Sequence, residues 1–131
     1  MSAPVRIALV GLGWWGQKIT AVLKAAPDDV TIVRAVEPNG EIASAFSTAH
    51  DVPVSADLET ALADPAVEAV LLVTPHKLHA AQIAASAAAG KHVFCEKPVA
   101  MTRAGAERAV SAVEAAGLIL ATGHERRYEP P

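Results

Sequence analysis

The regular alternation of short apolar runs with alanine-rich stretches constrains the fold of this chain more than any other feature. The apolar runs are continuous and rich in β-branched residues, as strands buried on both faces are. They span residues 5–10, 30–36, 67–73, 92–95 and 118–122, with a weaker run through Pro53 and Val54. The stretches between them have helical spacing of apolar positions, over residues 15–26, 40–50, 57–63, 77–89 and 102–116. This order predicts an α/β fold with a doubly wound parallel sheet, in which all strand carboxyl ends share one edge.

Residues suited to helix ends stand where this assignment needs them. Asp57 and Thr102 are suitable N-caps, and Gly90 and Gly117 are suitable C-terminal stops. A chain of 131 residues that is 52% hydrophobic can build one core, so we expect a single domain.

Charge and composition exclude several classes of partner. The formal net charge is −3 and the 11 Lys and Arg residues are scattered, so we expect no binding of nucleic acid or of anionic membranes. No stretch approaches the ~20 apolar residues of a membrane span, and the glycine-interrupted run after Arg6 does not match a secretory signal. Cys95 is the only cysteine, so no internal disulfide can form. The sequence therefore predicts a cytoplasmic protein.

The stretch GLGWWG, at residues 11–16, carries the glycine spacing G-x-G-x-x-G between the first predicted strand and the first predicted helix. In this context Gly11 permits a tight turn, Gly13 lets a pyrophosphate approach the backbone, and Gly16 lets the helix pack closely on the strand. The pattern predicts a Rossmann fold that binds a dinucleotide. The alternative is a turn whose glycines serve packing alone.

Trp14 and Trp15 fill the two variable positions of this glycine pattern. Adjacent residues diverge by about 100° around a helix, so both cannot face the same core. We expect at least one of them to be partly exposed near the cofactor, where it shields the site or packs on an element outside this chain.

Glu37 ends the second predicted strand, about 20 positions after the glycines. A carboxylate there can accept hydrogen bonds from the adenosine ribose hydroxyls and would repel a 2′-phosphate. No Arg or Lys follows within the next several positions. The sequence therefore favours NAD over NADP; the alternative role for Glu37 is that of a solvated loop acid.

Polar residues also follow the later strands. The backbone at Thr74 and Pro75 would pass the nicotinamide half of the cofactor. His76 and His79 lie at the start of the next predicted helix. Taken alone, two histidines at this spacing are more often a solvated surface than a site. Beside Thr74 and Pro75, we expect His76 and His79 to contribute to the cofactor site.

The segment CEKPVA, at residues 95–100, delivers Glu96, Lys97 and Pro98 in succession at the end of a buried strand. The alternative to a site here is a solvated turn with a proline stop. A cation beside a carbinol stabilises the alkoxide that develops as its hydride leaves, and Lys97 can supply that charge.

Four segments, in their order and spacing, resemble a known family. They are GLGWWG, VTPHKLHA, AAGKHVFCEKPVA and TGHERRYEP, and they look like the N-terminal half of the Gfo/Idh/MocA family, named after glucose–fructose oxidoreductase and inositol dehydrogenase. The resemblance covers nearly the entire chain. Its most specific part is GKHVFCEKP, and its least specific part is the glycine pattern.

The resemblance implies a nicotinamide-dependent oxidoreductase acting on a sugar, cyclitol or related polyol. It places Lys97 beside nicotinamide and substrate as the catalytic lysine, with Glu96 helping to position it and Pro98 turning the chain after a cis Lys97–Pro98 bond. It also places Arg127, followed by Tyr128, in the family's Arg-aromatic-x-Pro element.

The family has a second domain downstream, which supplies an Asp and a His base and through which members commonly associate. This chain holds no counterpart of it. We therefore assign residues 1–123 to the NAD(P)-binding domain and residues 124–131 to a segment leading out of it, and we expect a second domain or polypeptide to complete the site. A homo-oligomer is compatible with this organisation.

The same residues allow two other interpretations. One is a stand-alone NAD-binding or sensing module without catalytic activity, which would use the same residues. The other gathers His76, His79, Cys95 and Glu96 into a metal site; neither pair has a familiar zinc spacing, so we predict no metal.

Overall fold

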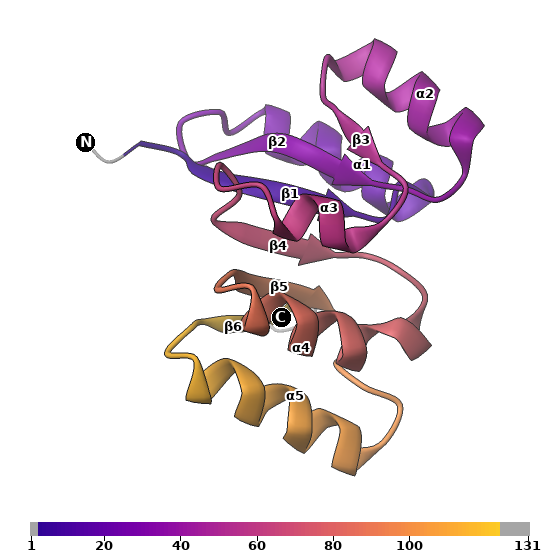
Figure 1. Ribbon diagram of the computed structural model, residues 1–131. Helices are drawn as coiled ribbons and strands as arrows, with labels where there is room; N and C mark the ends of the chain where they lie inside the picture. The colour runs from indigo at the N-terminus through magenta and orange to yellow at the C-terminus, as the bar shows by residue number, and fades with distance from the viewer. Residues whose placement is uncertain (1–2, 124–131) are drawn as a thin grey trace, which may run out of the picture.

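The computed structural model describes residues 3–123, which form one six-stranded sheet with helices on both faces (Figure 1). All neighbouring strands are parallel, and their order is β3-β2-β1-β4-β5-β6. The strands are β1 (Val5–Val10), β2 (Val30–Val36), β3 (Val54–Ser55), β4 (Ala69–Leu72), β5 (His92–Glu96) and β6 (Leu120–Gly123). The predicted doubly wound parallel sheet is confirmed.

β1 is central, and the chain winds away from it in both directions. β2 and β3 extend the sheet on one side, and β4, β5 and β6 extend it on the other. Val10 is in register with Val36 on one side and with Leu72 on the other. The residues that follow these three strands therefore lie at the same level, at the point where open α/β sheets bind their ligands.

The helices begin and end at residues with the expected capping chemistry. They are α1 (Trp14–Lys24), α2 (Gly40–His50), α3 (Leu58–Leu62), the 3₁₀ turn η1 (His76–Leu78), α4 (His79–Ala88) and α5 (Arg103–Ala115). The Asp57 side chain accepts a hydrogen bond from the Thr60 N–H, and the Thr102 side chain accepts one from the Gly105 N–H. Gly90 and Gly117 have φ of +78° and +69°, so both predicted caps and both predicted stops are confirmed.

Two apolar clusters sandwich the sheet. One packs β1, β4 and β5 against α3, α4 and α5, which lie together on the near face in Figure 1, and includes Val10, Ile83 and Val113. The other packs the opposite face of β1 and β2 against α1 and α2, and includes Leu9 and Phe46. Strands with apolar residues on both faces explain the unbroken apolar runs in the sequence.

The second face is covered over only half of the sheet. Leu71 of β4, Phe94 of β5 and Ala121 of β6 are in register and follow one another outward from β1. Leu71 is buried, Phe94 is 39% exposed and Ala121 is exposed. A hollow of about 470 Å³ lies over this region, and its lining includes Trp15, Ile19, Val22, Leu71 and Phe94. We call it the apolar groove.

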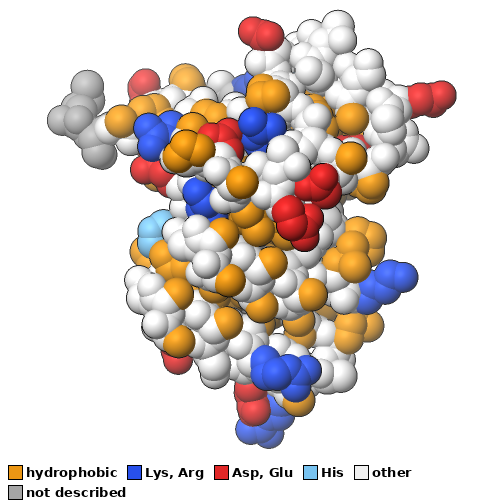
Figure 2. All heavy atoms as spheres, in the orientation of Figure 1, with side chains coloured by type: hydrophobic (Ala, Val, Ile, Leu, Met, Phe, Trp, Pro, Cys, Tyr) orange, Lys and Arg blue, Asp and Glu red, His pale blue; other side chains and the backbone are white. Residues whose placement is uncertain are grey.

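Charged side chains are dispersed over the face of the molecule seen in Figure 2, with acidic and basic groups interspersed. Within residues 3–123, no helix combines the length and the hydropathy that crossing a bilayer requires.

Candidate functional site

The glycine-containing turn after β1 is held by close backbone packing. Gly11 has φ of +102°, and a Cβ atom on it would come within 2.8 Å of the Val73 carbonyl oxygen. A Cβ atom on Gly16 would overlap the Gly11 carbonyl oxygen. Both positions therefore require glycine, because α1 lies directly on the turn and the turn lies directly on the end of β4.

Gly13 differs from the other two glycines because its α-carbon faces open space. A Cβ atom there would meet no atom of residues 3–123 within 4 Å. Gly13 is also the N-cap of α1, which begins with no side-chain cap and no acidic residue in its first turn. The N–H groups of this turn and the positive end of the helix dipole are thus open to an anion.

Glu37 is attached to the same turn by its carboxylate. Oε1 accepts a hydrogen bond from the Leu12 N–H, and Oε2 accepts one from the Asn39 N–H, each at 3.0 Å. These two bonds fix the carboxylate beside the glycines at the carboxyl ends of β1 and β2. Each oxygen keeps a further lone pair, so the group can still accept hydrogen bonds from a ligand hydroxyl.

A cavity of about 320 Å³ lies farther along the same edge, past β4. It is lined by Trp15, Val73, Thr74, His76, Glu96 and Lys97. Three segments far apart in the sequence therefore bring five of the predicted site residues to one place. Lys97 is exposed, so its ammonium group is free to reach a ligand in the cavity.

The chain turns sharply where it leaves β5. The Lys97–Pro98 peptide bond is cis, as the resemblance implied. The Glu96 carboxylate lies against Gly123, where an added Cβ atom would come within 2.5 Å of Oε1. Gly123 therefore leaves the room that Glu96 occupies.

The two tryptophans are both accessible, as expected for at least one of them. Trp14 is 71% exposed and Trp15 is 39% exposed, and their rings stack with centroids 5.7 Å apart. Lys18 Nζ lies 4.7 Å from the centroid of the Trp14 ring. Only Trp15 lines the cavity, and it also lines the apolar groove.

His79 corrects the sequence interpretation. The sequence predicted either a solvated histidine or one that contacts the cofactor, yet His79 has 0% exposure and cannot touch a ligand directly. Its Nδ1 lies 2.6 Å from the Pro98 carbonyl oxygen and its Nε2 lies 3.0 Å from the Thr74 carbonyl oxygen. His76, in contrast, is exposed and faces the cavity.

The metal-site hypothesis fails on the chemistry of its ligands. Burial, with a smaller contribution from Glu96, raises the pKa of the Cys95 thiol to about 12, so a thiolate is disfavoured. Both ring nitrogens of His79 are occupied by carbonyl oxygens. Over residues 3–123, no three His, Cys, Asp or Glu side chains come together as ligands would.

Sequence reasoning missed several supporting groups. Asn39 both caps α2 and donates its N–H to Glu37, and its position before a helix could have revealed the first role. The Leu12 N–H and Gly123 carried no signal of their own, because backbone donors and steric room depend on the fold.

Two predicted site residues remain to be placed. Pro75 is exposed and precedes η1, and Arg127 lies outside the described residues.

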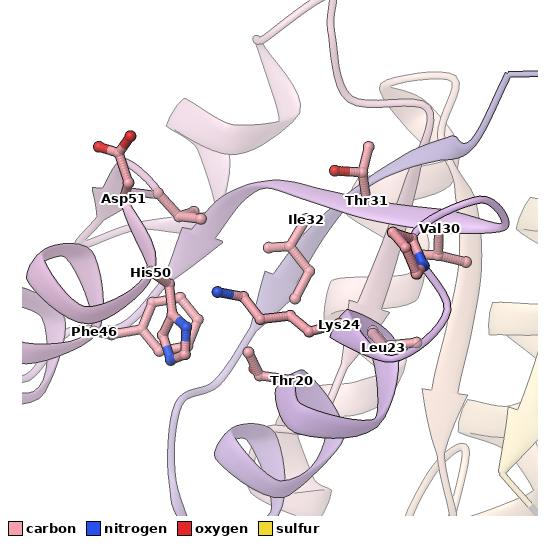
Figure 3. A pocket seen from close by; sticks show the side chains of 11 residues that line it. Thr20, Leu23, Lys24, Val30, Thr31, Ile32, Phe46, His50 and Asp51 are labelled. Carbon is pink, nitrogen blue, oxygen red and sulfur yellow. The ribbon is translucent and has the colours of Figure 1, made fainter.

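A second cavity, of about 240 Å³, lies between α1, α2 and the start of β2, at the opposite edge of the sheet (Figure 3). His50 and Lys24 are the last residues of their helices, and the Lys24 amine points toward the His50 ring, which lies beside Phe46. Burial and the charge of Lys24 lower the pKa of His50. Its Nδ1 is buried without a hydrogen-bond partner among the described residues.

Comparison with known proteins supports a nucleotide-binding role for the edge that carries the glycines. A family model described as an oxidoreductase family with an NAD-binding Rossmann fold matches residues 5–124. The 4-carboxy-2-hydroxymuconate-6-semialdehyde dehydrogenase of Sphingobium sp. is 40% identical over 130 residues, which are 96% of this chain and 40% of that protein. The inositol 2-dehydrogenase of Acidothermus cellulolyticus is 37% identical over 133 residues, covering 96% of this chain and 38% of that protein.

Among solved structures, the chain is similar to the WlbA dehydrogenase from Bordetella pertussis, determined in complex with NADH and UDP-GlcNAcA. The TM-score is 0.93 at 29% sequence identity, covering 97% of this chain and 37% of the other. The chain therefore spans about two fifths of the length of the proteins that it matches.

Proposed function

Because this chain belongs to the Gfo/Idh/MocA family of oxidoreductases, we propose that it is the cofactor-binding part of an enzyme that transfers a hydride between NAD and a sugar, cyclitol or related polyol. One observation carries the proposal most directly. The open, uncapped start of α1 lies beside a carboxylate fixed at the end of β2, where the chain winds away from β1 in both directions.

The residues of the edge fit a dinucleotide in three parts. The N–H groups after Gly13 would hold the pyrophosphate, since no described side chain caps this helix start and Gly13 faces open space among the described residues. Glu37 would accept the adenosine ribose hydroxyls. The cavity lined by Trp15, Thr74 and Lys97 would receive the nicotinamide ring, which exchanges the hydride when bound.

Lys97 is the catalytic residue in this proposal. Its ammonium group, at the mouth of the cavity, would stabilise the negative charge that develops on a carbinol oxygen as the hydroxyl proton leaves. Glu96 lines the same cavity and would restrict where the lysine can point.

A preference for NAD over NADP follows from the electrostatics of Glu37. A 2′-phosphate would approach a carboxylate whose two oxygens are already fixed by N–H donors and cannot turn away.

A second domain or polypeptide would complete the site. The relatives are more than twice as long as this chain, and the apolar groove shares Trp15 and Glu96 with the cavity. A partner seated in the groove would cover Phe94 and close the cavity at the same time. The second domain or polypeptide would supply the catalytic base, on the side of the cavity opposite Lys97. A cytoplasmic location and a homo-oligomer are compatible with this arrangement.

The test is a titration of the 131-residue chain with NADH and with NADPH, in which quenching of tryptophan emission reports binding. We expect saturable binding that prefers NADH. Glu37→Ala should weaken NADH binding by about 10-fold or more and abolish the preference, because a charge-assisted hydrogen bond contributes about 1.5–3 kcal/mol.

Glu41→Ala is the matched control. It removes an exposed carboxylate from the first turn of α2, four positions away, and leaves both bonds of Glu37 intact. It should bind both nucleotides as the wild type does. Absence of binding to either nucleotide by the wild type would refute the proposed function.

A further inference from the structure

His79 is a fully buried histidine whose two ring nitrogens both contact backbone carbonyl oxygens. The contacts join Nδ1 to the Pro98 oxygen at 2.6 Å and Nε2 to the Thr74 oxygen at 3.0 Å. Both distances lie within the range of good N–H···O hydrogen bonds or slightly below it.

A neutral imidazole has one N–H donor and one acceptor nitrogen, and a carbonyl oxygen can only accept a hydrogen bond. At least one of the two contacts is therefore an N–H···O hydrogen bond, and the ring fills the space between the two carbonyl groups in a dry environment. Removing the ring nitrogens would leave a buried carbonyl group without its partner, which is costly.

The two carbonyl groups belong to the two segments that frame the cavity. Thr74 follows β4, and its own side chain contacts Gln82 of α4. Pro98 follows the cis peptide bond next to Lys97. No strand pairing extends past Leu72 and Cys95 in the β4–β5 ladder, so beyond that point the segments need another connection.

We propose that His79 is a positioning residue that fixes the separation of the Thr74 and Lys97–Pro98 segments, and so the width of the cavity that receives the nicotinamide. The inference rests on the proposed function, because that function assigns the nicotinamide to this cavity. The inference goes beyond the proposed function in one respect. It assigns to His79, which is buried and cannot touch the cofactor, an effect on the binding of the nicotinamide half alone.

The experiment compares the affinity of the 131-residue chain for NADH and for ADP-ribose, which lacks the nicotinamide ring. His79→Phe keeps a ring of similar shape and removes both ring nitrogens. His79→Asn keeps one donor near the position of Nδ1, and His79→Gln keeps one near the position of Nε2. We expect each variant to bind NADH about 10-fold more weakly and to bind ADP-ribose within about twofold of the wild type.

Ser86→Ala is the control for general destabilisation of α4. Ser86 is fully buried in the same helix, and its hydroxyl donates to the Gln82 carbonyl oxygen, away from the cavity. It should leave both affinities unchanged. Equal loss of both affinities in the His79 variants, or no loss of either, would overturn the positioning role.

A measurement on the wild type does not depend on whether the variants fold. Proton NMR should show a slowly exchanging ring N–H signal for His79, because a buried ring N–H bonded to a backbone carbonyl is protected from water. Absence of such a signal would overturn the hydrogen bonding of His79. Failure of the wild type to bind either ligand would instead refute the proposed function, and the positioning role with it.

Discussion

At the residue scale, Gly13 and Gly16 stand in the same turn of α1, yet a methyl group on each would meet different surroundings. At Gly16 it would overlap the Gly11 carbonyl oxygen, and at Gly13 it would enter open space. We expect Gly16→Ala to destabilise the fold by about 1–3 kcal/mol through overpacking. Gly13→Ala should cost about 1 kcal/mol or less, yet weaken NADH binding by about 10-fold, because the methyl group stands where the pyrophosphate would approach.

Urea unfolding and NADH titration separate the two effects. A Gly13→Ala variant that binds NADH as well as the wild type would show that the pyrophosphate does not use this turn.

The sequence could place these glycines and Glu37 at strand ends because their positions depend on the local chain. A tight turn, an uncapped helix start and an acid at a strand end are each visible within a few residues. The contacts of His79 were not predictable, because its Nδ1 meets the carbonyl oxygen of Pro98, 19 positions away, at 2.6 Å. Whether a histidine is solvated or buried depends on what packs over it.

At the scale of the element, α5 depends on one side chain at its start. The Thr102 hydroxyl oxygen accepts a hydrogen bond from the Gly105 N–H at 3.0 Å. Thr102→Ala should destabilise the chain by about 1 kcal/mol, as loss of an N-cap typically does. Thr102→Ser keeps the oxygen and should recover most of the loss. Thermal unfolding checks both variants, and equal melting temperatures for Ala and Ser would rule out the cap as the cause.

The sequence predicted every strand and helix, and it erred at their ends. The last strand was expected at residues 118–122 and lies at Leu120–Gly123, since ladder pairing with β5 decides where it begins. The helix expected from residue 77 starts as the 3₁₀ turn His76–Leu78 and becomes α4 at His79. Apolar periodicity reports which face of an element is buried, whereas tertiary packing fixes its first and last residues.

At the scale of the whole molecule, His50 links stability to pH. Burial, and then the charge of Lys24, lower the pKa of His50 from 6.5 in the folded state. The unfolded chain therefore binds a proton more readily than the folded chain as the pH falls through 6.5. We expect the free energy of unfolding to decrease from pH 7 toward pH 5, and His50→Phe to make that decrease shallower. Urea unfolding at a series of pH values measures the slope.

Lys24→Met provides the control for this slope. It removes the charge and keeps an apolar stem beside the ring, so the pKa of His50 should move back toward 6.5 and the slope should lie between those of the wild type and His50→Phe. A slope unchanged in both variants would assign the pH dependence to other groups.

The apolar groove predicts how the isolated chain behaves at high concentration. With Phe94 and Trp15 both 39% exposed over a hollow of about 470 Å³, the chain should self-associate and bind a dye such as ANS. Phe94→Thr should reduce both effects. Ile119→Thr, which changes a residue that is 67% exposed and outside the groove, should reduce neither. Sedimentation and dye fluorescence measure the outcome, and equal effects of the two substitutions would rule out the groove as the contact.

The central position of β1 also sets an order of assembly during synthesis on the ribosome. All but one of the buried residues in the apolar cluster against α1 and α2 lie within residues 7–52, so most of this cluster can pack while the later strands are still being made. The cluster on the other face includes residues from Ala8 to Val113, so it can pack completely only after α5 has been synthesised. The glycine turn after β1 is therefore completed in two steps, because α1 can pack on it early, whereas its contact with Val73 forms only after β4 has been synthesised.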